Sequence, residues 1–379
     1  MMTMKQNIVL KNLDKTNWKS FRFDQIANKI SETVDPNTTD LEIYIGLEHI
    51  DAESIHINRQ GTPADVSGGK LKCYPGDVIF GKRRAYQRKA AIVDFEGICS
   101  AHAFVLRANP KVIDPKLFPF FLHSDLFMHK AVDISVGGLS PTINWGQLKE
   151  QEFLLPPKDQ QAQLAELLWT MDEVIARENE VLEKLIKEDL AYLKHYFYDD
   201  KNSERIKLKH IVSVKKGKKP PVLLEEGDGL PYCTAKYLRT GKIESIVPKE
   251  SWNKSIKIDE TDILILWDGS NAGEMLFGKE GFLASTMCKL IIKKEGFLKD
   301  FVFQFLRFKT NDIKRATVGS AIPHVDPGMI ENIEIPKLTK IDQEVIINLF
   351  NSLNNSIKLV ELKISSSKSL QKSLINQVF

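Results

Sequence analysis

The feature that most constrains this chain is an internal repeat. Residues 159–175, DQQAQLAELLWTMDEVI, recur in altered form at residues 341–357 as IDQEVIINLFNSLNNSI. Aligning Gln161 with Gln343 gives an offset of 343 − 161 = 182 residues, and this offset continues without a gap until Phe197 meets Phe379. A repeat has to be recognised before any fold is proposed, because it indicates that two copies of one unit make up the chain.

Within each copy, the apolar residues advance alternately by four and three positions. This heptad spacing is typical of a coiled-coil seam rather than of the broader stripe of a helix on a globular core. We therefore predict one long helix per copy, the alternative being two unrelated surface helices. Glu178, Asp189 and Ser367 interrupt the pattern. The predicted seam consists of Leu164, Leu168, Met171, Ile175 and Leu182 in the first copy and Ile346, Phe350, Leu353, Ile357 and Ile364 in the second.

The repeat extends upstream of the helices. SVGGLSPTINWGQL (135–148) matches TVGSAIPHVDPGMI (317–330), PGDVIFGK resembles ETDILILW with Asp77 opposite Asp262, and YIGLEHI resembles YCTAKYL. The chain is therefore a tandem in which a globular unit and a helix occur twice. The predicted boundaries are 1–155 and 200–338 for the globular domains, and 156–199 and 339–379 for the helical spacers. The polar stretch 199–204 is the predicted linker out of the first helix.

Short β-type runs fill the globular units, among them DVIFGK, AAIVDF, AFVLR, DILILW and CKLII, with turn-rich stretches between them. The best helix candidates there are 115–132 and 298–317. A length of 379 residues favours two hydrophobic cores. The predicted fold is α+β, with two strand-rich domains separated by two long coiled-coil helices. A pseudo-twofold arrangement makes the second helix run back, so the helices are predicted to be antiparallel.

This geometry suits DNA. A helix of about 38 residues would be about 57 Å long at 1.5 Å per residue, so a packed pair would form a rigid spacer. Two similar but different heads on such a spacer could read two half-sites, which predicts a bipartite, asymmetric recognition sequence. The net charge of +3 says little by itself, but local basic density says more.

Two basic runs and one turn are the candidate DNA contacts. In GKRRAYQRK, the arginines offer phosphate or guanine contacts and Tyr86 offers apolar packing, although such a run could also be a solvated hairpin. In SVKKGKKPP, lysines around a flexible glycine suggest phosphate positioning, with a plain surface loop as the alternative. In WDGSNAG, Asp268 and Asn271 could cap a turn, or Ser270 and Asn271 could meet base edges; the structural role is favoured. The predicted DNA-binding residues are Lys82, Arg83, Arg84, Tyr86, Arg88, Lys89, Lys215, Lys216, Lys218, Lys219, Ser270 and Asn271.

The chain resembles the specificity subunit of type I restriction-modification systems over essentially its whole length. The resemblance rests on YIGLEHI, FGKRRAYQRKAAIVDFEGICSAHAFVLR, LWDGSNAG, and the LPPKDQQ and IPKLTKIDQ lead-ins to the helices. It implies two target-recognition domains, a bipartite DNA site, and assembly with two methyltransferase subunits and with restriction (motor-nuclease) subunits that methylate adenine or cleave. It also implies that S-adenosylmethionine, ATP and magnesium are bound by the partner subunits, and that this chain binds no cofactor.

The motifs of an enzyme are missing from the sequence. LPPK and KPPV lack the first and last residues of the Asn/Asp-Pro-Pro-aromatic motif of DNA amino-methyltransferases, and there is no Walker lysine motif. Glu361-x-Lys363 has no upstream metal-binding aspartate, and Cys99-x-x-His102 alone is more typical of a core than of a metal site. We therefore predict neither a catalytic nor a metal site. A free-standing DNA-binding regulator, or a catalytic polypeptide with unfamiliar motifs, remain as alternatives.

The compartment is predicted from what the sequence lacks. There is no apolar stretch of signal-peptide length at the N-terminus, and none approaches the roughly 20 residues of a membrane span. The four cysteines form no Cys-x-x-Cys pair. The expectation is a cytoplasmic protein without membrane contact.

Overall fold

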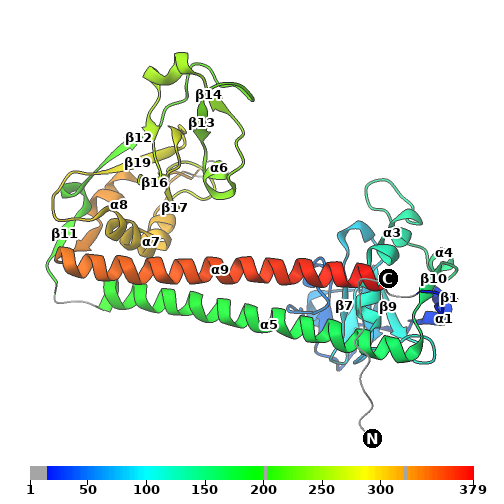
Figure 1. The fold of residues 1–379 in the computed structure, drawn as a ribbon. Helices are drawn as coiled ribbons and strands as arrows, with labels where there is room; N and C mark the ends of the chain where they lie inside the picture. Colours follow the sequence, from blue (N-terminus) through cyan, green and yellow to red (C-terminus); the bar gives the residue numbers. More distant parts are fainter. Residues whose placement is uncertain (1–14, 200–202, 320–322) are drawn as a thin grey trace, which may run out of the picture. The chain divides into compact units, whose positions relative to one another are not determined.

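The computed structural model describes residues 15–199, 203–319 and 323–379 of the chain (Figure 1). The N-terminal segment, half of the predicted linker and three residues of the second upstream repeat fall outside these ranges. The chain forms two compact units. Unit 1 comprises residues 1–179 and 362–379, and unit 2 comprises residues 180–361. Each unit therefore contains one strand-rich head, the first half of the long helix that follows it, and the second half of the other long helix.

The head of unit 1 is built on two four-stranded sheets. One has the order β2-β9-β6-β7 and is antiparallel throughout; the other has the order β3-β5-β8-β4, with β4 parallel to β8. A separate pair, β1 and β10, joins the two ends of the head. The strands are β1 (Lys19–Arg22), β2 (Ala27–Ile30), β3 (Thr33–Val34), β4 (Tyr44–Ile45), β5 (Lys70–Cys73), β6 (Val78–Gly81), β7 (Ala90–Ile92), β8 (Gly97–Cys99), β9 (Ala103–Ala108) and β10 (Glu152–Leu155), and the helices are α1 (Phe23–Ile26), α2 (Phe118–His123), α3 (Asp125–Asp133) and α4 (Trp145–Leu148).

The head of unit 2 repeats this plan. Its sheets have the orders β12-β19-β16-β17 and β14-β13-β18-β15, with β13 parallel to β18, and β11 pairs with β20. An edge strand differs, because β3 extends the second sheet beside β5 in unit 1 whereas β14 extends it beside β13 in unit 2. The strands are β11 (Arg205–Lys207), β12 (Val212–Lys216), β13 (Leu230–Cys233), β14 (Ile246–Val247), β15 (Lys257–Ile258), β16 (Ile263–Leu266), β17 (Met275–Phe277), β18 (Gly281–Leu283), β19 (Met287–Ile292) and β20 (Glu334–Pro336), and the helices are α6 (Ala235–Thr240), α7 (Lys299–Arg315) and α8 (Pro327–Asn332).

The central strands explain why the repeat reads as continuous apolar runs. A strand covered on both faces needs apolar side chains at every position rather than at alternate ones. In β6, Phe80 faces a core beneath the helices while Ile79 faces the second sheet. In β16, Ile265 and Leu264 divide in the same way between two cores. The predicted strand runs DVIFGK and DILILW are thus the doubly covered centres of the two heads.

One predicted helix is divided in two. The candidate at 115–132 forms α2 and α3, separated at Ser124, whose backbone is extended (φ −64°, ψ 147°). The Ser124 hydroxyl accepts a hydrogen bond from the Phe127 amide at 3.2 Å, and this N-cap favours a new helix start over continuation. The candidate at 298–317 forms a single helix, α7, as predicted.

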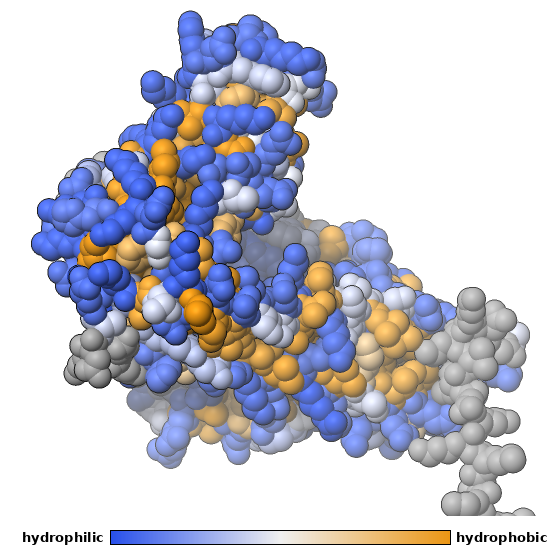
Figure 2. Space-filling model, turned by 60° about the vertical axis from the view of Figure 1, so that its left-hand side comes forward, coloured by the Kyte–Doolittle hydropathy of each residue, from blue (hydrophilic) through white to orange (hydrophobic). Residues whose placement is uncertain are grey.

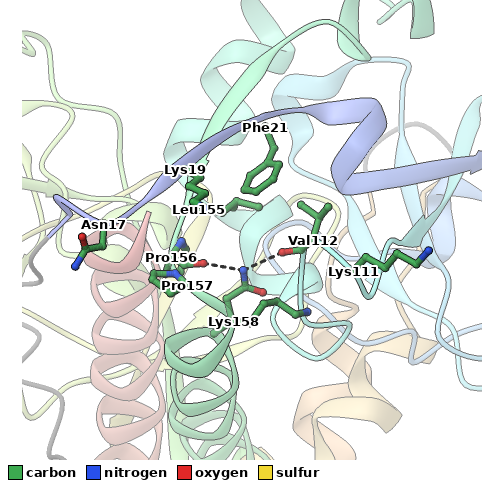
Figure 3. Close-up of a pocket in the computed structure, with 10 residues that line it drawn as sticks. Asn17, Lys19, Phe21, Lys111, Val112, Leu155, Pro156, Pro157 and Lys158 are labelled. Carbon is green, nitrogen blue, oxygen red and sulfur yellow. Dashed lines mark hydrogen bonds between the residues drawn. The ribbon is translucent and has the colours of Figure 1, made fainter.

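The two long helices are present as predicted. α5 spans Lys158–Lys194 and continues into a π-helical turn at His195–Asp199, and α9 spans Lys340–Val378. Each is fixed to its own head by a buried glutamine near its start. Gln161 accepts a hydrogen bond from the Asp114 amide at 2.6 Å and donates to the carbonyls of Val112 and Pro156 (Figure 3). It borders a pocket of about 260 Å³ lined also by Lys19, Lys111 and Lys158.

Gln343 makes the matching contacts at the start of α9. It accepts from the Leu298 amide at 2.8 Å and donates to the carbonyls of Gly296 and Leu338. Burying an amide side chain is unfavourable unless its polar atoms are paired, and here the partners are backbone groups of a loop that would otherwise lack them. This explains why the repeat is recognisable at these two glutamines.

Within each unit the halves of α5 and α9 run antiparallel, as predicted. In unit 1, Glu178 accepts a hydrogen bond from Ser367 at 3.2 Å, and further along α5 toward its start, Asp172 contacts Gln371. In unit 2, Arg307 of α7 binds both Asp189 at 2.7 Å and Asn354 at 3.1 Å. The polar interruptions of the heptad pattern are therefore paired with one another or with a head rather than left unpaired.

The helices are less independent of the heads than a coiled-coil seam implies. Leu164 and Leu168 share a cluster with Leu117 and Phe120 of the first head, and Phe350 shares a cluster with Phe301 and Phe305 of the second. The expectation of a narrow seam was therefore wrong for the first half of each helix, where a wider apolar face covers the head. Among the other predicted seam residues, Ile175, Ile346, Leu353 and Ile364 are buried and Met171, Leu182 and Ile357 are half-buried.

Candidate nucleic-acid interface

In each head, one loop follows a central strand of the fully antiparallel sheet. This strand is β6 in unit 1 and β16 in unit 2. In unit 1, the backbone of Arg83 forms an isolated antiparallel β-bridge with that of Thr142, and the Arg84 amide donates to the Pro141 carbonyl at 2.7 Å. In unit 2, the backbone of Asp268 forms the same kind of β-bridge with that of His324, and the Gly269 amide donates to the Pro323 carbonyl at 2.9 Å. Two of the three predicted contact segments, KRRAYQRK and WDGSNAG, therefore occupy the same place in the two heads, which the sequence analysis did not recognise.

A buried carboxylate lies at the opposite end of each of these strands, just before β6 and just before β16. Asp77 accepts from the Tyr74 amide at 3.0 Å and from the Arg107 Nε and Nη2 atoms at 2.7 and 3.0 Å. Asp262 accepts from the Asp259 amide at 3.0 Å and from Lys289 Nζ at 2.6 Å. The alignment of these two aspartates in the sequence thus corresponds to one structural role, which is to fix the turn before the central strand.

The unit 1 loop presents positive charge to solvent. Arg83 and Arg84 are exposed, and Tyr86 is 54% exposed. Lys82 is half-buried; its burial and the charge of Lys29 lower the pKa of its ammonium group. Phosphate would be favoured at such a place because it offsets the mutual repulsion of these cations.

Arg88 and Lys89 are occupied within the protein. Arg88 Nη1 lies 2.7 Å from Asp125 Oδ1, and Nη2 donates to the His123 carbonyl at 2.8 Å. Lys89 Nζ donates to the Leu47 carbonyl at 2.6 Å. The structure therefore separates these two residues from the exposed arginines of the same run and gives them an anchoring geometry.

An apolar tip that was not predicted from the sequence lies beside this loop. Leu139 is 98% exposed and Val136 is 61% exposed, on the turn that pairs with Arg83 through Thr142. Arg84 Nε donates to the hydroxyl of Ser140 in the same turn at 3.1 Å. The available signal was the upstream repeat itself, which contains this turn and its counterpart 182 residues later.

In unit 2 the basic run lies on β12 and its extension. Lys215, Lys216, Lys218 and Lys219 are all exposed, and Lys216 Nζ lies 2.8 Å from Asp268 Oδ2. The glycine between them is not flexible, contrary to the expectation. Gly217 is buried, its amide donates to the Met287 carbonyl at 2.8 Å, and a Cβ atom there would lie 2.0 Å from the Ala284 carbonyl oxygen. Glycine is required because another backbone approaches this closely.

The turn of unit 2 is closed by its own backbone. The Ala272 amide donates to the Gly269 carbonyl and the Glu274 amide to the Asn271 carbonyl. The Asp268 carboxylate binds Lys216. Ser270 and Asn271 are exposed on this turn, available to an outside partner.

No group of three or more metal-ligating side chains occurs in the described part of the chain, and the predicted core residue Cys99 is buried while His102 is exposed. Within the same residues, no helix combines the length and the apolar character needed to cross a bilayer.

Comparison with known proteins identifies the family. The sequence model of the type I restriction modification DNA specificity domain matches residues 15–187 and again residues 200–367. The chain belongs to this family. The two matches correspond to the two copies of the repeat, and the resemblance inferred from the sequence is confirmed.

Individual relatives agree. A type I restriction enzyme specificity subunit of Methanocaldococcus jannaschii (MjaVIII) is 37% identical over 46% of this chain and 41% of its own length. A second, putative one from the same organism (MjaX) is 22% identical over 86% of this chain and 83% of its own. The chain thus spans less than half the length of the first relative in the alignment.

Solved structures support the fold. A chain from a study of the assembly and conformational transition of a type I restriction-modification system superposes with a TM-score of 0.62 at 17% identity, covering 95% of this chain and 97% of the other. The S subunit from M. genitalium gives 0.61 at 17% identity, covering 97% and 98%. The predicted fold class is confirmed: two strand-rich domains and two long helices in a tandem repeat.

Proposed function

We propose that this chain is the DNA-recognition subunit of a type I restriction-modification complex and that each head reads one half of a bipartite, asymmetric site. The observation that carries the proposal is the matched loop. Two heads with the same strand order place loops of different charge at the same position, with Arg83 and Arg84 in one and Asp268 and Gly269 in the other. One scaffold with two different surfaces is suited to two different half-sites.

The contact residues follow from exposure. In unit 1, we assign phosphate or guanine contacts to Arg83 and Arg84, since guanidinium groups can bind either in a bidentate manner, and base or sugar packing to Tyr86. Lys82 adds positive charge at the same edge. In unit 2, Lys215, Lys218 and Lys219 position the phosphate backbone, and Ser270 and Asn271 meet base edges. The domain boundaries 1–155, 156–199, 200–338 and 339–379 remain our working division into two target-recognition domains and two helical spacers.

The long helices offer a surface for partner subunits. Apolar side chains remain exposed on α5 and α9, and the surface drawn in Figure 2 carries apolar patches among polar ones. Leu167, Val174 and Val181 recur every seven residues on α5, the spacing that a partner helix would cover. We assign this surface to two methyltransferase subunits. S-adenosylmethionine, ATP and magnesium, together with a restriction subunit, belong to that assembly, which acts on double-stranded DNA in the cytoplasm.

The proposal is tested by mapping methylated adenines. The full chain is expressed with its methyltransferase subunit in cells that lack both, and methylated adenines are located by sequencing. A two-part motif that appears only when both proteins are present supports the proposal. Methylation by the methyltransferase alone at the same motif, or by this chain alone, contradicts it. Tight selective binding without any methylation would instead support the free-standing regulator.

A further inference from the structure

The loop proposed to contact DNA in unit 1 has an unusual backbone. In the described part of the chain, the non-glycine residues with positive φ are Glu53, Arg84 and Arg88, at 58°, 55° and 52°. Two of them, Arg84 and Arg88, flank the short 3₁₀ turn Ala85–Gln87 that carries Tyr86. The third is bonded to the same loop, because the Glu53 amide donates to the Arg88 carbonyl at 3.1 Å. Left-handed backbone is unfavourable for a non-glycine residue, so it persists only where surrounding contacts hold it.

The contacts that hold Arg88 lead to the other end of the chain. Asp125 accepts a hydrogen bond from Arg88 through Oδ1, and its Oδ2 accepts from Asn376 Nδ2 at 2.7 Å. Asn376 also accepts from the Asp125 amide at 2.8 Å, so it clamps Asp125 from two sides. Asn376 lies near the end of α9, more than 280 residues beyond Arg88 in the sequence.

A second connection runs parallel to the first. Lys372, one turn before Asn376 on α9, lies 2.6 Å from Glu53, and Glu53 lies 3.5 Å from Arg88 Nε. The hydrogen bond and charge of Lys372 lower the pKa of Glu53. Among the described residues, the Arg88 guanidinium contacts one further group, the carbonyl of His123, which is buried and whose pKa burial lowers to about 4.

We propose that the last turns of α9 position the DNA-reading loop of unit 1, with Asn376 and Lys372 as positioning residues that act through Asp125, Glu53 and Arg88. This inference rests on the proposed function and deepens it. Arg88 then affects recognition without touching DNA, by keeping Tyr86 and the two exposed arginines in one arrangement. A loop that is free to relax would keep its charge, and with it the non-specific phosphate attraction, but would lose its discrimination between bases.

The experiment selects binding sites from duplex DNA with randomised bases, using the full chain together with its methyltransferase subunit. The variants are Asn376→Ala and the double variant Asn376→Ala with Lys372→Ala. Gln377→Ala is the matched control, because among the described residues the Gln377 side chain hydrogen-bonds only to Ser373 of its own helix. Arg83→Ala with Arg84→Ala identifies which half of the selected motif unit 1 reads. Discrimination is measured as the affinity ratio between the best duplex and duplexes with one changed base.

The expected result is specific to one half-site. The double variant should lower discrimination in the unit 1 half about tenfold, leave the other half unchanged, and leave the salt dependence of binding unchanged because no phosphate contact is lost. Arg88→Lys, which keeps the charge but cannot bridge the same partners, should do the same. If Asn376→Ala and the double variant discriminate as the wild type does, the inference is wrong.

Two further outcomes separate a positioning role from others. If Arg88→Lys alone changes discrimination while the α9 variants do not, Arg88 contacts DNA directly and the inference is wrong. If the α9 variants lower the melting temperature of unit 1 and weaken both halves and non-specific binding together, the role is only structural, which also overturns it. If the wild-type chain selects no two-part motif, the proposed function fails and this inference with it.

Discussion

The two heads differ little in what holds them together and greatly in what they present. Both have the same antiparallel core sheet, both fix the turn before its central strand with a buried aspartate, and both hold the following long helix with a buried glutamine. At the matched loop, however, unit 1 presents two exposed arginines, whereas unit 2 presents an acid neutralised by Lys216. The two heads therefore share their scaffold contacts but differ in the loop residues that they expose. The scaffold contacts are buried and involve backbone groups, whereas the loop side chains are exposed and can differ without changing the fold.

The largest expected effect concerns the shared scaffold. Asp77→Ala and Asp262→Ala each leave a cation and a backbone amide without their buried acceptor, so each should destabilise its own unit by about 3 kcal/mol. Hydrogen exchange of the amides in β9 and β19 reports the two units separately. Loss of protection in both units from either single substitution, or in neither, would show that the two aspartates do not play matched local roles.

A second prediction concerns His123 of α2, a buried histidine without a counterpart in the matching helix of unit 2. The pKa of His123 is lowered to about 4 by burial, and α7, its counterpart, contains no histidine. Because the pKa of His123 is lower in the folded than in the unfolded chain, protons bind preferentially to the unfolded chain as the pH falls. The contribution of His123 to the free energy of unfolding is therefore complete above pH 6.5 and decreases as the pH drops toward 4. At pH 5 the loss is about 2 kcal/mol.

This pH effect is measured as the difference between wild type and His123→Gln. Glutamine can still donate to the Ala90 carbonyl, as the imidazole does at 2.7 Å, but it does not titrate. The wild type should lose more stability in unit 1 between pH 7 and pH 5 than the variant. His56 acts in the opposite direction, because its hydrogen bond to Asp172 raises its pKa and its contribution is lost as the pH rises above 6.5 through that raised value. Equal pH profiles for the two proteins would refute the assignment.

The third prediction concerns the charge of the unit 1 loop. Arg83→Ala with Arg84→Ala should weaken DNA binding about 10- to 100-fold and flatten the slope of log K against log salt by about one unit per lost phosphate contact. Arg177→Ala is the control, since Arg177 is an exposed arginine on α5 that pairs only weakly with Glu173. An unchanged slope would remove this loop from the interface.

The smallest expected effect has the opposite sign and belongs to unit 2. Asp268→Asn removes a negative charge beside Lys216 and frees that lysine, so non-specific DNA binding should become a few-fold tighter and steeper in salt by up to about one unit. Glu280→Gln is the matched control, because Glu280 is an exposed acid of the same head paired with Lys257. Equal effects of the two substitutions on DNA binding would show that Asp268 is no closer to the DNA contacts than another exposed acid of the same head.

Much of this architecture could be predicted from the sequence because both copies of the repeat carry the same apolar spacing and the same apolar runs. The 182-residue offset predicted two heads and two helices, and apolar runs predicted the central strands. Ser124 shows one limit, since a single N-cap divides a helix whose apolar pattern is continuous. Leu168 and Phe350 show another, because heptad spacing does not reveal that a helix face is shared between a partner helix and a head.

The site was harder to predict than the fold. Arg83 and Arg88 look alike in the sequence, but one is exposed and the other is held by Asp125 and His123, residues about 40 positions away. Gly217 looked flexible because its neighbours are lysines, but the constraint on it comes from the Ala284 carbonyl of another strand end. Such distinctions depend on long-range contacts, which composition and spacing do not encode.

The central claim is that each head reads its own half of one DNA site. It is tested most directly by mapping methylated adenines in cells that express the full chain and its methyltransferase subunit, with two variants compared. One carries Arg83→Ala, Arg84→Ala and Tyr86→Ala in unit 1, and the other carries Ser270→Ala and Asn271→Ala in unit 2. The account predicts that each variant relaxes a different half of the motif and leaves the other half as in the wild type. Relaxation of the same half by both variants, or of both halves by either one, would contradict it.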